Sequence, residues 1–589
     1  MLVGNFFKNI NPKYKSHFFS GLSFNSLNVN KNNIFFSIKG TKINGNQFIN
    51  NAIKKGAKTI VSDLKIKGLK NKVLYIKTNN PRKLLSEVAS KVYRQKPKNL
   101  IAVTGTNGKS SITDFYFQIL NLNNIKVASI GTLGIKTHLK KIQIKNTTLD
   151  PISLNYHLQK IKKLKINNII LEASSHGLKQ NRLDGLKFNS GIFSNLSHDH
   201  LDYHKSYKDY LKSKLKLFEK LLKKKSNTIV DANIPEYKII KGISLKNKSR
   251  LITVSNKNSD LSIISHKYLG EKQLVKIKYK NFFYSIELNL VGKIQIKNIL
   301  MAVVAATKSN IKIKKIINTL SKIKPVNGRM EKVGIINNNA IVILDYAHTP
   351  EALLTCLKNV KDQFKSRKIS IVFGCGGDRD KFKRPIMGKI ANSYCDKIYL
   401  TDDNPRFESP NSIRLAIKKK INKFKLHEIS NREKAIEKAI INLYSGEILI
   451  VAGRGHETIQ DYGNKKKFFS DKNFILKFIK QKNKKLKKNL KLNILKEISN
   501  KSHLPTNPKI RMASINSKEI KKNDIFFAIQ GKKNDGHLFL KEAINKGASL
   551  AVVSRTNKFV KKNKQIKVKN SLDFLTKTSK IVRANSNGT

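Results

Sequence analysis

Short apolar runs bounded by glycine-rich or polar turns recur along the chain and predict buried strands. The run at 100–103 leads into a glycine-rich turn and then into an amphipathic pattern typical of a helix. Two further runs, 167–171 and 191–195, each end in polar residues. Strands that alternate with helical segments are typical of α/β proteins with parallel sheets. In such sheets, ligands bind at the carboxyl ends of the strands, so we expect functional side chains there.

A stretch of 38 residues occurs twice, near the two ends of the chain. Residues 24–61 align without a gap with residues 515–552, and roughly half of the aligned positions are identical. Each copy has an Asn-Ser turn, an apolar run (IFFSI or IFFAI), a glycine, and a helical pattern that ends at Lys-Gly-Ala. The glycine after the helix fits a carboxyl-terminal cap. One small α/β module is therefore expected twice, either as a duplicated scaffold or as two related proteins joined.

The composition restricts the class of protein. The 589 residues include 118 Lys and Arg against 38 Asp and Glu, a net charge of +80, yet 39% are hydrophobic and 8% aromatic, too many for a disordered polyelectrolyte. No apolar run approaches the roughly 18 residues of a membrane span. The amino terminus lacks the apolar core of a secretory signal, and the three cysteines have neither disulfide nor zinc-finger spacing. We therefore expect a multidomain cytoplasmic protein.

The basic residues are spread along the whole chain rather than gathered in one stripe. They accompany many Asn and Ile residues, and Trp is absent, which favours a coding sequence drifting towards A and T. Binding of a polyanion and attraction of a small anionic substrate are the alternatives. Lysine runs such as 223–225 and 484–488 are interpreted as solvated faces or linkers, and no nucleic-acid partner is expected.

Residues 99–117 (NLIAVTGTNGKSSITDFYF) predict a strand, a glycine-rich loop and a helix. Gly105 and Gly108 let backbone N–H groups close around phosphate oxygens, and the helix amino terminus adds a favourable dipole. Lys109 would neutralise phosphate charge, and the Ser110 hydroxyl would reach Mg²⁺. The first glycine is closer to Gly-Lys-Ser than in the usual P-loop, but the strand–loop–helix context predicts phosphate binding.

Polar residues follow the two other buried runs. Glu172 ends the first, and a carboxylate at that edge of a sheet can hold Mg²⁺. The second run leads to residues 198–204 (HDHLDYH), which taken alone are either a zinc site or a polar loop. Lys214 follows about fourteen residues after His200 in a lysine-rich helical pattern. By pattern alone, Lys214 belongs to a surface helix.

In their order along the chain, these segments resemble the Mur ligases. The resemblance rests on 104–111 (TGTNGKSS), 172–178 (EASSHGL), 195–204 (NLSHDHLDYH) and 328–331 (GRME). Three further motifs resemble the members of this family that add meso-diaminopimelate to UDP-N-acetylmuramoyl-L-alanyl-D-glutamate in peptidoglycan synthesis. They are 345–350 (DYAHTP), 373–380 (FGCGGDRD) and 403–406 (DNPR). The match extends from about residue 20 to residue 485.

The resemblance implies an α/β fold of three domains followed by an extra module. The domains are a UDP-substrate-binding domain (1–96), a central P-loop ATPase-like domain (97–324) and a Rossmann-like domain for the amino acid (325–485). A basic linker (486–492) and a second amino-terminal-like module (493–589) follow. This module resembles the amino-terminal domain of the ligase that adds D-alanyl-D-alanine, and no second phosphate loop follows it. We interpret it as a truncated fusion, with docking of UDP-substrate or of a partner as the alternative.

The resemblance also implies an ATP-dependent ligase that works through an acyl phosphate. ATP would phosphorylate the D-glutamyl carboxylate, and the amine of diaminopimelate would displace phosphate. The implied catalytic residues are Lys109, Glu172, His200 and Lys214, and the implied Mg²⁺ ligands are Ser110, Glu172, His200 and Lys214. Lys214 matches the lysine that this family carbamylates to N6-carboxylysine, a change that turns a cation into an anionic metal ligand.

The contacts that the resemblance implies fall into three sets. ATP would be contacted by Gly105, Thr106, Asn107, Gly108, Lys109, Ser110, Ser111, Asn298, Arg329 and Asp345. The UDP-sugar-peptide would be contacted by Ser26, Thr147, Thr148, Ser174, Gln180 and Arg182. Diaminopimelate would be contacted by Arg379, Asp403, Asn404, Pro405, Arg406, Gly453 and Glu457. Arg406 can fork onto a carboxylate, and Glu457 is placed for the distal ammonium.

Three positions depart from the family pattern: Leu27 stands where arginine is usual, Gln295 where asparagine is frequent, and Asn327 where proline is usual. The alternative functions are a ligase of the same architecture with another acceptor such as L-lysine, a nucleic-acid-binding NTPase, and an inactive relic that serves as a scaffold. The motif at 403–406 argues against the first, and the complete catalytic set argues against the last. We expect a monomer, with contacts to other cell-wall ligases left open.

Overall fold

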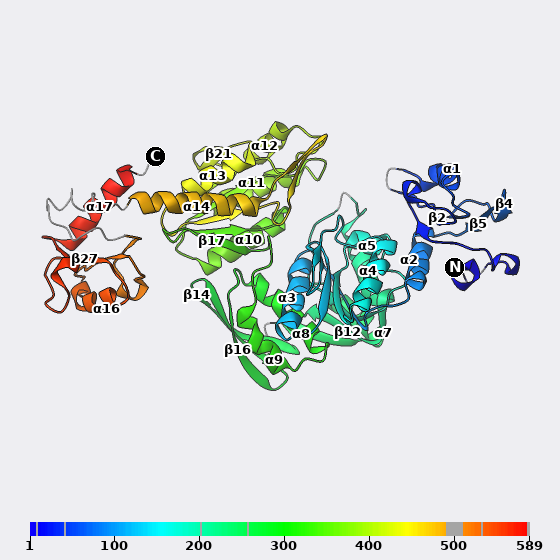
Figure 1. Cartoon of the computed structure of the whole chain (residues 1–589), viewed down its shortest axis with the longest axis horizontal. Coiled ribbons are helices and arrows are strands. Elements are labelled where there is room, and N and C mark those ends of the chain that lie inside the picture. The colour runs from blue at the N-terminus through cyan, green and yellow to red at the C-terminus, as the bar shows by residue number, and fades with distance from the viewer. Residues whose placement is uncertain are drawn as a thin grey trace. The chain divides into compact units, whose positions relative to one another are not determined.

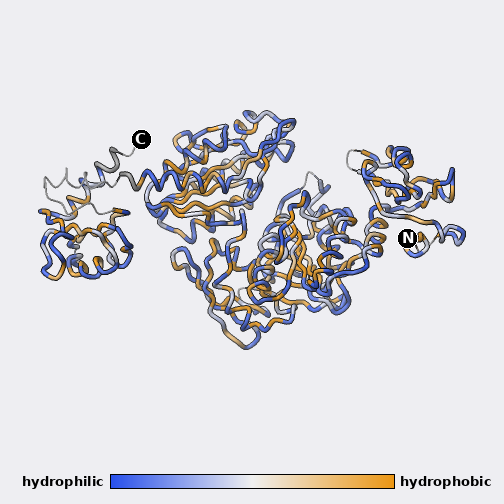
Figure 2. Tube along the Cα trace, in the orientation of Figure 1, coloured by the Kyte–Doolittle hydropathy of each residue, from blue (hydrophilic) through white to orange (hydrophobic). Residues whose placement is uncertain are grey.

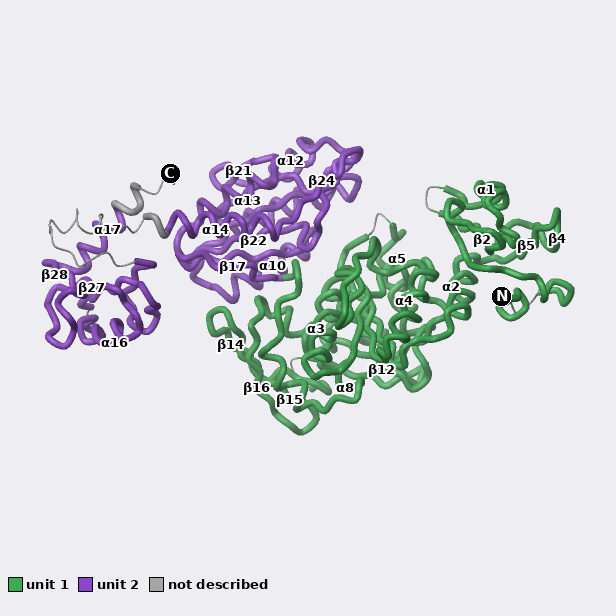
Figure 3. Tube along the Cα trace, in the orientation of Figure 1, with its two compact units in different colours: residues 1–329 green, residues 330–589 purple. Residues whose placement is uncertain are grey.

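The computed structural model describes residues 1–7, 10–40, 43–200, 203–255, 258–489, 510–531 and 534–585. The chain divides into two compact units, Met1–Arg329 and Met330–Thr589, which Figure 3 shows in different colours. The predicted boundaries at 96 and 485 fall inside these units. In the described part of the chain, no helix is both long enough and apolar enough to cross a membrane.

The first unit begins with a small sheet and two helices: β1 (Leu22–Ser23), β2 (Ile34–Phe36), α1 (Ile49–Lys54), β3 (Thr59–Ser62), β4 (Gly68–Lys70), β5 (Val73–Lys77) and α2 (Pro81–Val92). The strand order is β1-β2-β3-β5-β4, and all pairs are parallel except that of β4 with β5. Helix α2 starts where the Asn80 side chain accepts a hydrogen bond from Lys83 N and proline fills the first position, as expected for a helix amino terminus.

An eleven-stranded sheet forms the rest of the first unit. Its strands are β6 (Asn99–Thr104), β7 (Val127–Gly131), β8 (Gly134–Lys136), β9 (Lys141–Ile142), β10 (Asn168–Glu172), β11 (Phe188–Phe193), β12 (Leu222–Asp231), β13 (Arg250–Ser255), β14 (Leu261–Leu269), β15 (Lys272–Tyr279) and β16 (Phe282–Leu288). Its helices are α3 (Lys109–Leu122), α4 (Pro151–Lys163), α5 (Ser175–Lys179), α6 (Tyr207–Lys216), α7 (Tyr237–Lys246), α8 (Ile294–Thr307) and α9 (Ile313–Thr319). The order is β16-β15-β14-β13-β12-β11-β6-β10-β7-β8-β9, parallel from β14 to β7.

Helices cover both faces of this sheet, which explains why its middle strands are apolar along their whole length. Ile101 and Val103 pack into one core with residues of α3 and α8, whereas Leu100 and Ala102 pack into a second core with residues of α4. Figures 1 and 2 show the helices around the sheet and the apolar residues concentrated along its strands. The continuous apolar run at 100–103 is therefore a strand buried on both sides.

The carboxyl ends of β6, β10 and β11 meet at one edge of the sheet because these strands are parallel neighbours. This confirms the three strands predicted from the apolar runs. Strand β11 ends two residues earlier than expected, at Phe193. Beyond it, Ser194 N still donates to Thr104 O, but the side chains of Ser194 and Asn195 donate hydrogen bonds to the carbonyl oxygen of Asn107 in the glycine-rich loop.

The second unit is built around a six-stranded sheet and a two-stranded ribbon. Its strands are β17 (Glu331–Ile335), β18 (Ile341–Leu344), β19 (Ile369–Phe373), β20 (Lys397–Leu400), β21 (Leu426–Glu428), β22 (Ile448–Val451), β23 (Ile459–Tyr462) and β24 (Lys465–Phe468). Its helices are α10 (Pro350–Gln363), α11 (Lys383–Tyr394), α12 (Pro410–Lys418), α13 (Arg432–Ile441) and α14 (Asp471–Asn489). The order β17-β18-β22-β19-β20-β21 is parallel apart from β17, as in a Rossmann-like domain.

The structure corrects one prediction about a lysine-rich segment and confirms another. Helix α14 extends to Asn489, so residues 486–489 are helical rather than part of a linker. The remainder of the predicted linker, 490–492, lies outside the described residues. The run at 223–225 is exposed, which confirms the interpretation as a solvated face, and it lies near the start of strand β12.

The duplicated module is confirmed as a repeat of local structure. Its elements are β25 (Ala513–Ser514), β26 (Ile525–Phe527), α16 (Leu540–Asn545), β27 (Leu550–Val553), β28 (Gln565–Lys567) and α17 (Ser571–Asn585), with strand order β25-β26-β27-β28. The registers agree: Leu22 pairs with Ile34 in the first copy, and Ala513 pairs with Ile525 in the second. The predicted start at 493 and end at 589 lie outside the described residues.

The two copies differ at the turn that carries the predicted UDP-side serine. Ser26 is buried at the start of a short 3₁₀ turn, and Ser517 occupies the same place in the second copy. Ser517 donates a hydrogen bond of 2.9 Å to Glu542, which itself pairs with Lys546 at 2.6 Å. The position that aligns with Glu542 in the first copy is Asn51. The second copy therefore has a carboxylate against the serine where the first copy has a neutral side chain.

Candidate active site

The glycine-rich loop connects β6 to α3 and packs closely against two neighbouring segments. Gly105 has φ +143°, and a Cβ atom there would lie 1.9 Å from Ser194 Oγ. Gly108 has φ +86°, and a Cβ there would lie 2.5 Å from Asn298 Oδ1. Thr106 N and Asn107 N are held by the backbone oxygen and the side-chain oxygen of Asn195. Only glycine fits at these two positions, which fixes the path of the loop.

Two lysine ammonium groups meet at one carbonyl oxygen of this loop. Lys109 Nζ lies 2.9 Å and Lys214 Nζ 2.7 Å from Gly105 O. The Lys214 side chain is buried and lies over the Tyr210 ring at 4.4 Å. Burial, and secondarily the charge of Lys109, lower the pKa of Lys214 well below its usual value. Burial also lowers the pKa of Lys109, although Glu172 opposes that effect. The arrangement concentrates positive charge where the sequence predicts phosphate.

Glu172 is held at the carboxyl end of β10 by donors from two directions. Ser110 Oγ donates to Glu172 Oε2 at 3.1 Å, and Thr132 donates from its backbone N at 2.8 Å and from its hydroxyl at 3.0 Å. Gly131 leaves no room for a side chain, since a Cβ there would lie 2.3 Å from Glu172 Oε1. The carboxylate is therefore buried and oriented, with Ser110 as its neighbour.

Oxygen donors of this kind are what Mg²⁺ takes in proteins. Ser110 and Glu172 are in contact, so the structure brings together half of the predicted metal set. Among the described residues, no group of three or more His, Cys, Asp and Glu side chains could hold a metal ion. A zinc site at 198–204 therefore has no support in the described part of this loop, which lacks 201 and 202. The donor set fits a hard cation that also keeps oxygen atoms of a substrate.

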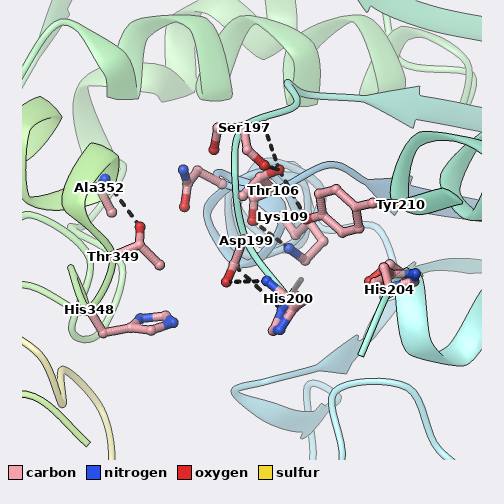
Figure 4. Close-up of polar contacts among 12 residues, drawn as sticks. Thr106, Lys109, Ser197, Asp199, His200, His204, Tyr210, His348, Thr349 and Ala352 are labelled. Atoms are coloured by element: carbon pink, nitrogen blue, oxygen red, sulfur yellow. Dashed lines mark hydrogen bonds and ion pairs between the residues drawn. The ribbon is translucent and has the colours of Figure 1, made fainter. Parts of the chain in front are cut away.

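The loop after β11 lies beside the glycine-rich loop, as Figure 4 shows. Thr106 Oγ1 is within 3.3 Å of Ser197 O and 3.0 Å of Tyr210 OH. His200 Nε2 is 3.5 Å from Asp199 Oδ2, and its backbone N donates to the same carboxylate at 2.8 Å. His200 has φ +55°. The loop thus presents a partly exposed imidazole backed by a carboxylate.

A second polar group lies between β10 and α5. Thr148 Oγ1 is 2.8 Å from Glu172 O and 3.0 Å from Ser174 Oγ, and Arg182 Nη1 donates to Thr148 O at 2.6 Å. Arg182 also donates to Gln180 Oε1 through Nε and Nη2. Thr147 Oγ1 reaches the same group through Thr132 Oγ1 at 3.0 Å. Five of the six residues predicted to contact the sugar-peptide therefore form one connected group: Thr147, Thr148, Ser174, Gln180 and Arg182.

Gln295, one of the departures from the family pattern, connects two predicted ATP contacts. Asn298 Nδ2 donates to Gln295 Oε1 at 3.1 Å, and Gln295 Nε2 donates to Arg329 O at 3.2 Å. Asn298 also faces Gly108, so this chain of contacts runs from the glycine-rich loop to Arg329. Gln295 therefore has a structural role here despite its difference from the usual residue.

In the second unit, a group of charged residues surrounds the carboxyl ends of β20 and β22. Asn404 donates to Glu457 Oε2 at 2.9 Å and accepts from Arg454 Nη1 at 2.7 Å. Tyr346 donates to Glu457 Oε1 at 3.1 Å. Asp403 is buried, and its Oδ2 has no hydrogen-bond partner among the described residues. Burial, and secondarily Asp403, raise the pKa of Glu457. Two neighbouring carboxylates, one of them without a hydrogen-bond partner for Oδ2 among the described residues, form a site suited to a cationic group.

Arg406 lies in the same loop with a left-handed backbone, φ +53°. Its Nη1 donates to Gly377 O at 2.6 Å, and its backbone N donates to Asp461 O at 3.0 Å. A Cβ at Gly376 would lie 2.9 Å from the guanidinium, so small residues leave room for it. Gly453 lies against Asp403 in the same way, at 2.5 Å. This loop therefore combines acidic and basic groups over a short distance along the chain.

The other predicted site residues lie at the ends of strands and in the turns of both units. Arg379 is an exposed residue of the loop after β19, and Ser26 lies in the amino-terminal sheet. Asp345 accepts hydrogen bonds from Met330 N and Ala347 N at the end of β18. Ser111 is buried in the first turn of α3, and Pro405 O accepts a hydrogen bond from Glu408 N at 3.1 Å.

Several residues of these sites were not predicted from the sequence. Thr132, which holds Glu172, directly follows the end of β7, and the rule that ligands gather at carboxyl ends of strands could have indicated it. Tyr346 lies inside the motif at 345–350, and Arg454 directly follows Gly453, one of the predicted diaminopimelate contacts. Tyr210 stands four residues before Lys214 and therefore shares its helix face. His176 and Tyr203 also belong to noticed motifs.

Comparison with known proteins agrees with this architecture. The model for the Mur ligase middle domain matches residues 103–306, and the Mur ligase, glutamate ligase domain matches 328–455. The model for the Mur ligase family, catalytic domain matches twice, at 19–93 and at 509–581. The double match coincides with the two structural copies of the small module.

Similar proteins of known name share most of their length with this chain. UDP-N-acetylmuramoyl-L-alanyl-D-glutamate–2,6-diaminopimelate ligase of Rickettsia prowazekii (strain Madrid E) is 39% identical over 478 residues, which is 80% of this chain and 98% of that protein. The ligase of the same name from Chelativorans sp. (strain BNC1) is 36% identical over 462 residues, 78% of this chain and 95% of that protein.

Solved structures show the same fold. A structure of UDP-N-acetylmuramoyl-L-alanyl-D-glutamate–2,6-diaminopimelate ligase has a TM-score of 0.59 and 28% identity, covering 80% of this chain and 97% of that chain. A MurF ligase from Thermotoga maritima in complex with ADP has a TM-score of 0.55 and 15% identity, covering 78% and 97%.

The close packing around Gly105 generates a testable prediction. Gly105→Ala should weaken ATP binding by at least about tenfold, because the new Cβ must displace Ser194 and disfavours the native φ. Isothermal titration calorimetry of ATP binding measures the effect, with circular dichroism to establish that the variant is folded. Gly270→Ala is a matched control, since Gly270 also has positive φ but no atom within 4 Å of the added Cβ. A folded Gly105→Ala variant that binds ATP normally would contradict the assignment of this loop.

Proposed function

This chain belongs to the Mur ligase family, and from that membership we propose that it joins meso-diaminopimelate to UDP-N-acetylmuramoyl-L-alanyl-D-glutamate in an ATP-dependent reaction. The relatives that carry this activity in their names are matched over 95–98% of their length. The observation that carries the proposal is the presence in one chain of a glycine-rich loop with two lysine side chains and of a hydrogen-bonded group of acidic and basic residues between 403 and 457.

The reaction consists of two transfers at one carboxylate. The D-glutamyl carboxylate oxygen attacks the γ-phosphorus of ATP, and ADP leaves, which gives an acyl phosphate. The amine of diaminopimelate then attacks the acyl carbon, loses a proton, and displaces inorganic phosphate to leave an amide. Both steps bring anionic groups together, so the site must offset their repulsion with cations and hydrogen-bond donors.

The residues of the first unit are suited to that task. Lys109 would neutralise the terminal phosphates from the amino terminus of α3, where backbone N–H groups also point outward. Asn298 and Arg329 would contact the nucleotide, and Asp345, which belongs to the second unit, its ribose. The connected group of Thr147, Thr148, Ser174, Gln180 and Arg182 would hold the muramoyl dipeptide, with Ser26 on the UDP side. Glu172 joins both regions, since Thr148 bonds to its backbone and Ser110 to its carboxylate.

Mg²⁺ would be held by Ser110, Glu172, His200 and a carbamylated Lys214. When bound, the ion supplies positive charge between phosphate and carboxylate oxygens. Carbamylation joins the neutral amine to CO₂ and releases a proton, which replaces an ammonium by an anionic oxygen donor. Burial and Lys109 lower the pKa of Lys214, so the neutral amine that this step needs is present at a lower pH than in an exposed lysine.

The second unit would select the acceptor. Diaminopimelate differs from L-lysine by one additional carboxylate at its distal end. Arg406 can bind that carboxylate with two parallel hydrogen bonds, supported by Arg379, Asn404 and the Pro405 turn. Asp403 and Glu457 would bind ammonium groups, and Gly453 leaves space beside Asp403. The pairing of acidic and basic groups matches the carboxylate and ammonium at the distal end of diaminopimelate better than the lone distal ammonium of L-lysine.

The acceptor assignment is tested with the purified chain, UDP-N-acetylmuramoyl-L-alanyl-D-glutamate, Mg²⁺-ATP and either amino acid. We expect ADP and tripeptide with meso-diaminopimelate, and kcat/KM for L-lysine lower by at least about 100-fold.

Arg406→Lys should raise the KM for diaminopimelate by at least about tenfold with little change in the KM for ATP, because one ammonium cannot replace the planar fork. Equal turnover of L-lysine, or an unchanged KM in the variant, would overturn the assignment.

Carbamylation of Lys214 predicts a dependence on CO₂ and pH. Lys214→Ala should lower kcat by about 10²–10³-fold, with partial rescue by added formate or acetate, whereas Lys212→Ala, on the exposed face of the same helix, should be near normal. Since the neutral amine reacts, lowering the pH should remove the carbamate and bicarbonate should restore activity. A ¹³C signal from ¹³C-bicarbonate should be present in the wild type and absent in Lys214→Ala. Full activity without that signal would exclude the modification.

We infer that the second module is not needed for this reaction, because relatives of nearly full coverage are matched by about 80% of the chain. Deletion of residues 490–589 should therefore leave kcat and the KM for diaminopimelate unchanged within about twofold. Because Glu542 accepts a hydrogen bond from Ser517, we also expect that this module does not bind the UDP-substrate through that serine. Calorimetric titration of the full chain with the UDP-substrate should then give one bound substrate molecule per chain. A large loss of kcat in a well-folded deletion variant would make the module a working part of the enzyme.

A further inference from the structure

The imidazole of His176 lies among three other rings at the edge of the central sheet. It stacks on Tyr203 with a centroid distance of 4.0 Å and an interplanar angle of 28°. It meets His200 edge-on at 4.8 Å and His204 at 5.6 Å. His176 comes from α5 and the other three from the loop after β11, so this cluster joins two segments that follow different strands.

One side of the cluster holds His200. The backbone of His200 is left-handed, with φ +55°, a conformation that is unfavourable for a residue with a side chain and persists only where the surroundings fix it. Its carbonyl oxygen accepts hydrogen bonds from Tyr203 N at 3.1 Å and His204 N at 2.9 Å. Its imidazole lies between Asp199 and the His176 ring. The direction of this partly exposed side chain thus depends on the cluster.

The other side of the cluster reaches the group proposed to bind the muramoyl dipeptide. Gln180 Nε2 donates to Tyr203 OH at 3.1 Å. The oxygen of the same amide accepts from Arg182, which in turn donates to Thr148 O. Because Gln180 must donate to Tyr203 and accept from Arg182, both ends of its amide are fixed. A continuous path of contacts therefore leads from Arg182 through Gln180, Tyr203 and His176 to His200.

His204 connects the cluster to the interior of the first unit. This side chain is buried, its Nε2 is 3.1 Å from Ser175 Oγ, and its ring lies 5.0 Å from that of Tyr210. Tyr210 OH is in turn 3.0 Å from Thr106 Oγ1 in the glycine-rich loop. His176 and Tyr203, in contrast, are only half-buried. These two rings are partly exposed, and the Tyr203 hydroxyl accepts a hydrogen bond from Gln180, a predicted substrate contact. Rings that only fill a hydrophobic core have neither property.

We propose that His176 and Tyr203 are positioning residues that hold Gln180 for the muramoyl dipeptide and orient His200, so that occupation of one site affects the other. Tyr203 fixes the amide of Gln180 through its hydroxyl and supports His176 through its ring. His176 then limits the directions open to the His200 imidazole. This inference rests on the proposed function, which assigns the dipeptide to Gln180 and the metal side of the site to His200.

The first test separates the hydroxyl of Tyr203 from its ring. In Tyr203→Phe the stack on His176 is kept and the bond to Gln180 is lost. We expect the dissociation constant of UDP-N-acetylmuramoyl-L-alanyl-D-glutamate, measured by calorimetry without ATP or metal, to rise roughly three- to tenfold, as for loss of one neutral hydrogen bond. The affinity for Mn²⁺, which substitutes for Mg²⁺ and is measured by electron paramagnetic resonance, should change by less than about twofold, because the ring that supports His176 is kept.

The second test removes the imidazole at the centre of the cluster. His176→Ala should weaken Mn²⁺ binding and lower kcat, each by at least about fivefold, whereas His176→Phe, which keeps a ring, should recover most of both. Tyr156→Phe and His157→Ala are matched controls, since these neighbouring rings lie on α4 and contact each other at 5.3 Å, away from the cluster. Both controls should behave as wild type in every measurement.

A double-variant cycle tests whether Tyr203 and His176 act together on dipeptide binding. If the contacts act as one path, Tyr203→Phe should change dipeptide binding by less than about twofold in a His176→Ala background. Effects that add, or Mn²⁺ binding that is unaffected by His176→Ala, would overturn the inference. If His176→Ala does not fold, the Tyr203→Phe and His176→Phe variants decide the same question. Absence of tripeptide synthesis by the wild type would instead count against the proposed function, so the two failures are distinguishable.

Discussion

The arrangement on which the first unit depends is the meeting of two lysine side chains at the carbonyl oxygen of Gly105. Like charges at such close range repel, and burial removes the water that would screen them. A protein can relieve this repulsion by losing a proton, by receiving an anion, or by converting one amine to an acid. In the reaction we propose, ATP would bring the anion, and carbamylation would need Lys214 to lose a proton before its amine is converted to an acid. The exclusion of any side chain at Gly105, the turn at Ser194 and the docking of α6 all serve to keep these two nitrogen atoms together.

In the second unit the side chains that repel each other are negatively charged. There the pair is acidic, a buried Asp403 and a partly buried Glu457, and the basic residues Arg406 and Arg454 come from the same two loops. A ligand with both carboxylate and ammonium groups can satisfy both kinds of charge, while a ligand with only one kind leaves the other unpaired. Because an unpaired buried charge is costly, the proposed selection of the acceptor would follow from the arrangement of charges as much as from shape.

The sequence predicts well what depends on neighbours along the chain. Strands β6, β10 and β11, the glycine-rich loop and the repeated module follow from apolar runs and glycine positions, and the motifs identify the family. It does not predict what depends on docking between distant segments. Lys214 follows the pattern of a surface helix, and only the packing of α6 against the loop at Gly105 buries it. Gln295 between Asn298 and Arg329 is recognised only when separate segments are brought together in space. The helical residues 486–489 show the converse error, since a lysine-rich composition alone does not end a helix.

The repeated module has a consequence for how the chain is made. Two segments with the same strand order and similar strands, such as β2 and β26, could pair with each other's partners and give a misassembled product, a known failure of proteins with homologous domains. The copies are about 490 residues apart, and at about 5–20 residues per second the ribosome needs roughly 25–100 s to travel that distance. Small α/β domains fold faster than this. The first copy would therefore be complete before the second emerges, so distance along the gene acts as a separation in time that keeps homologous strands apart.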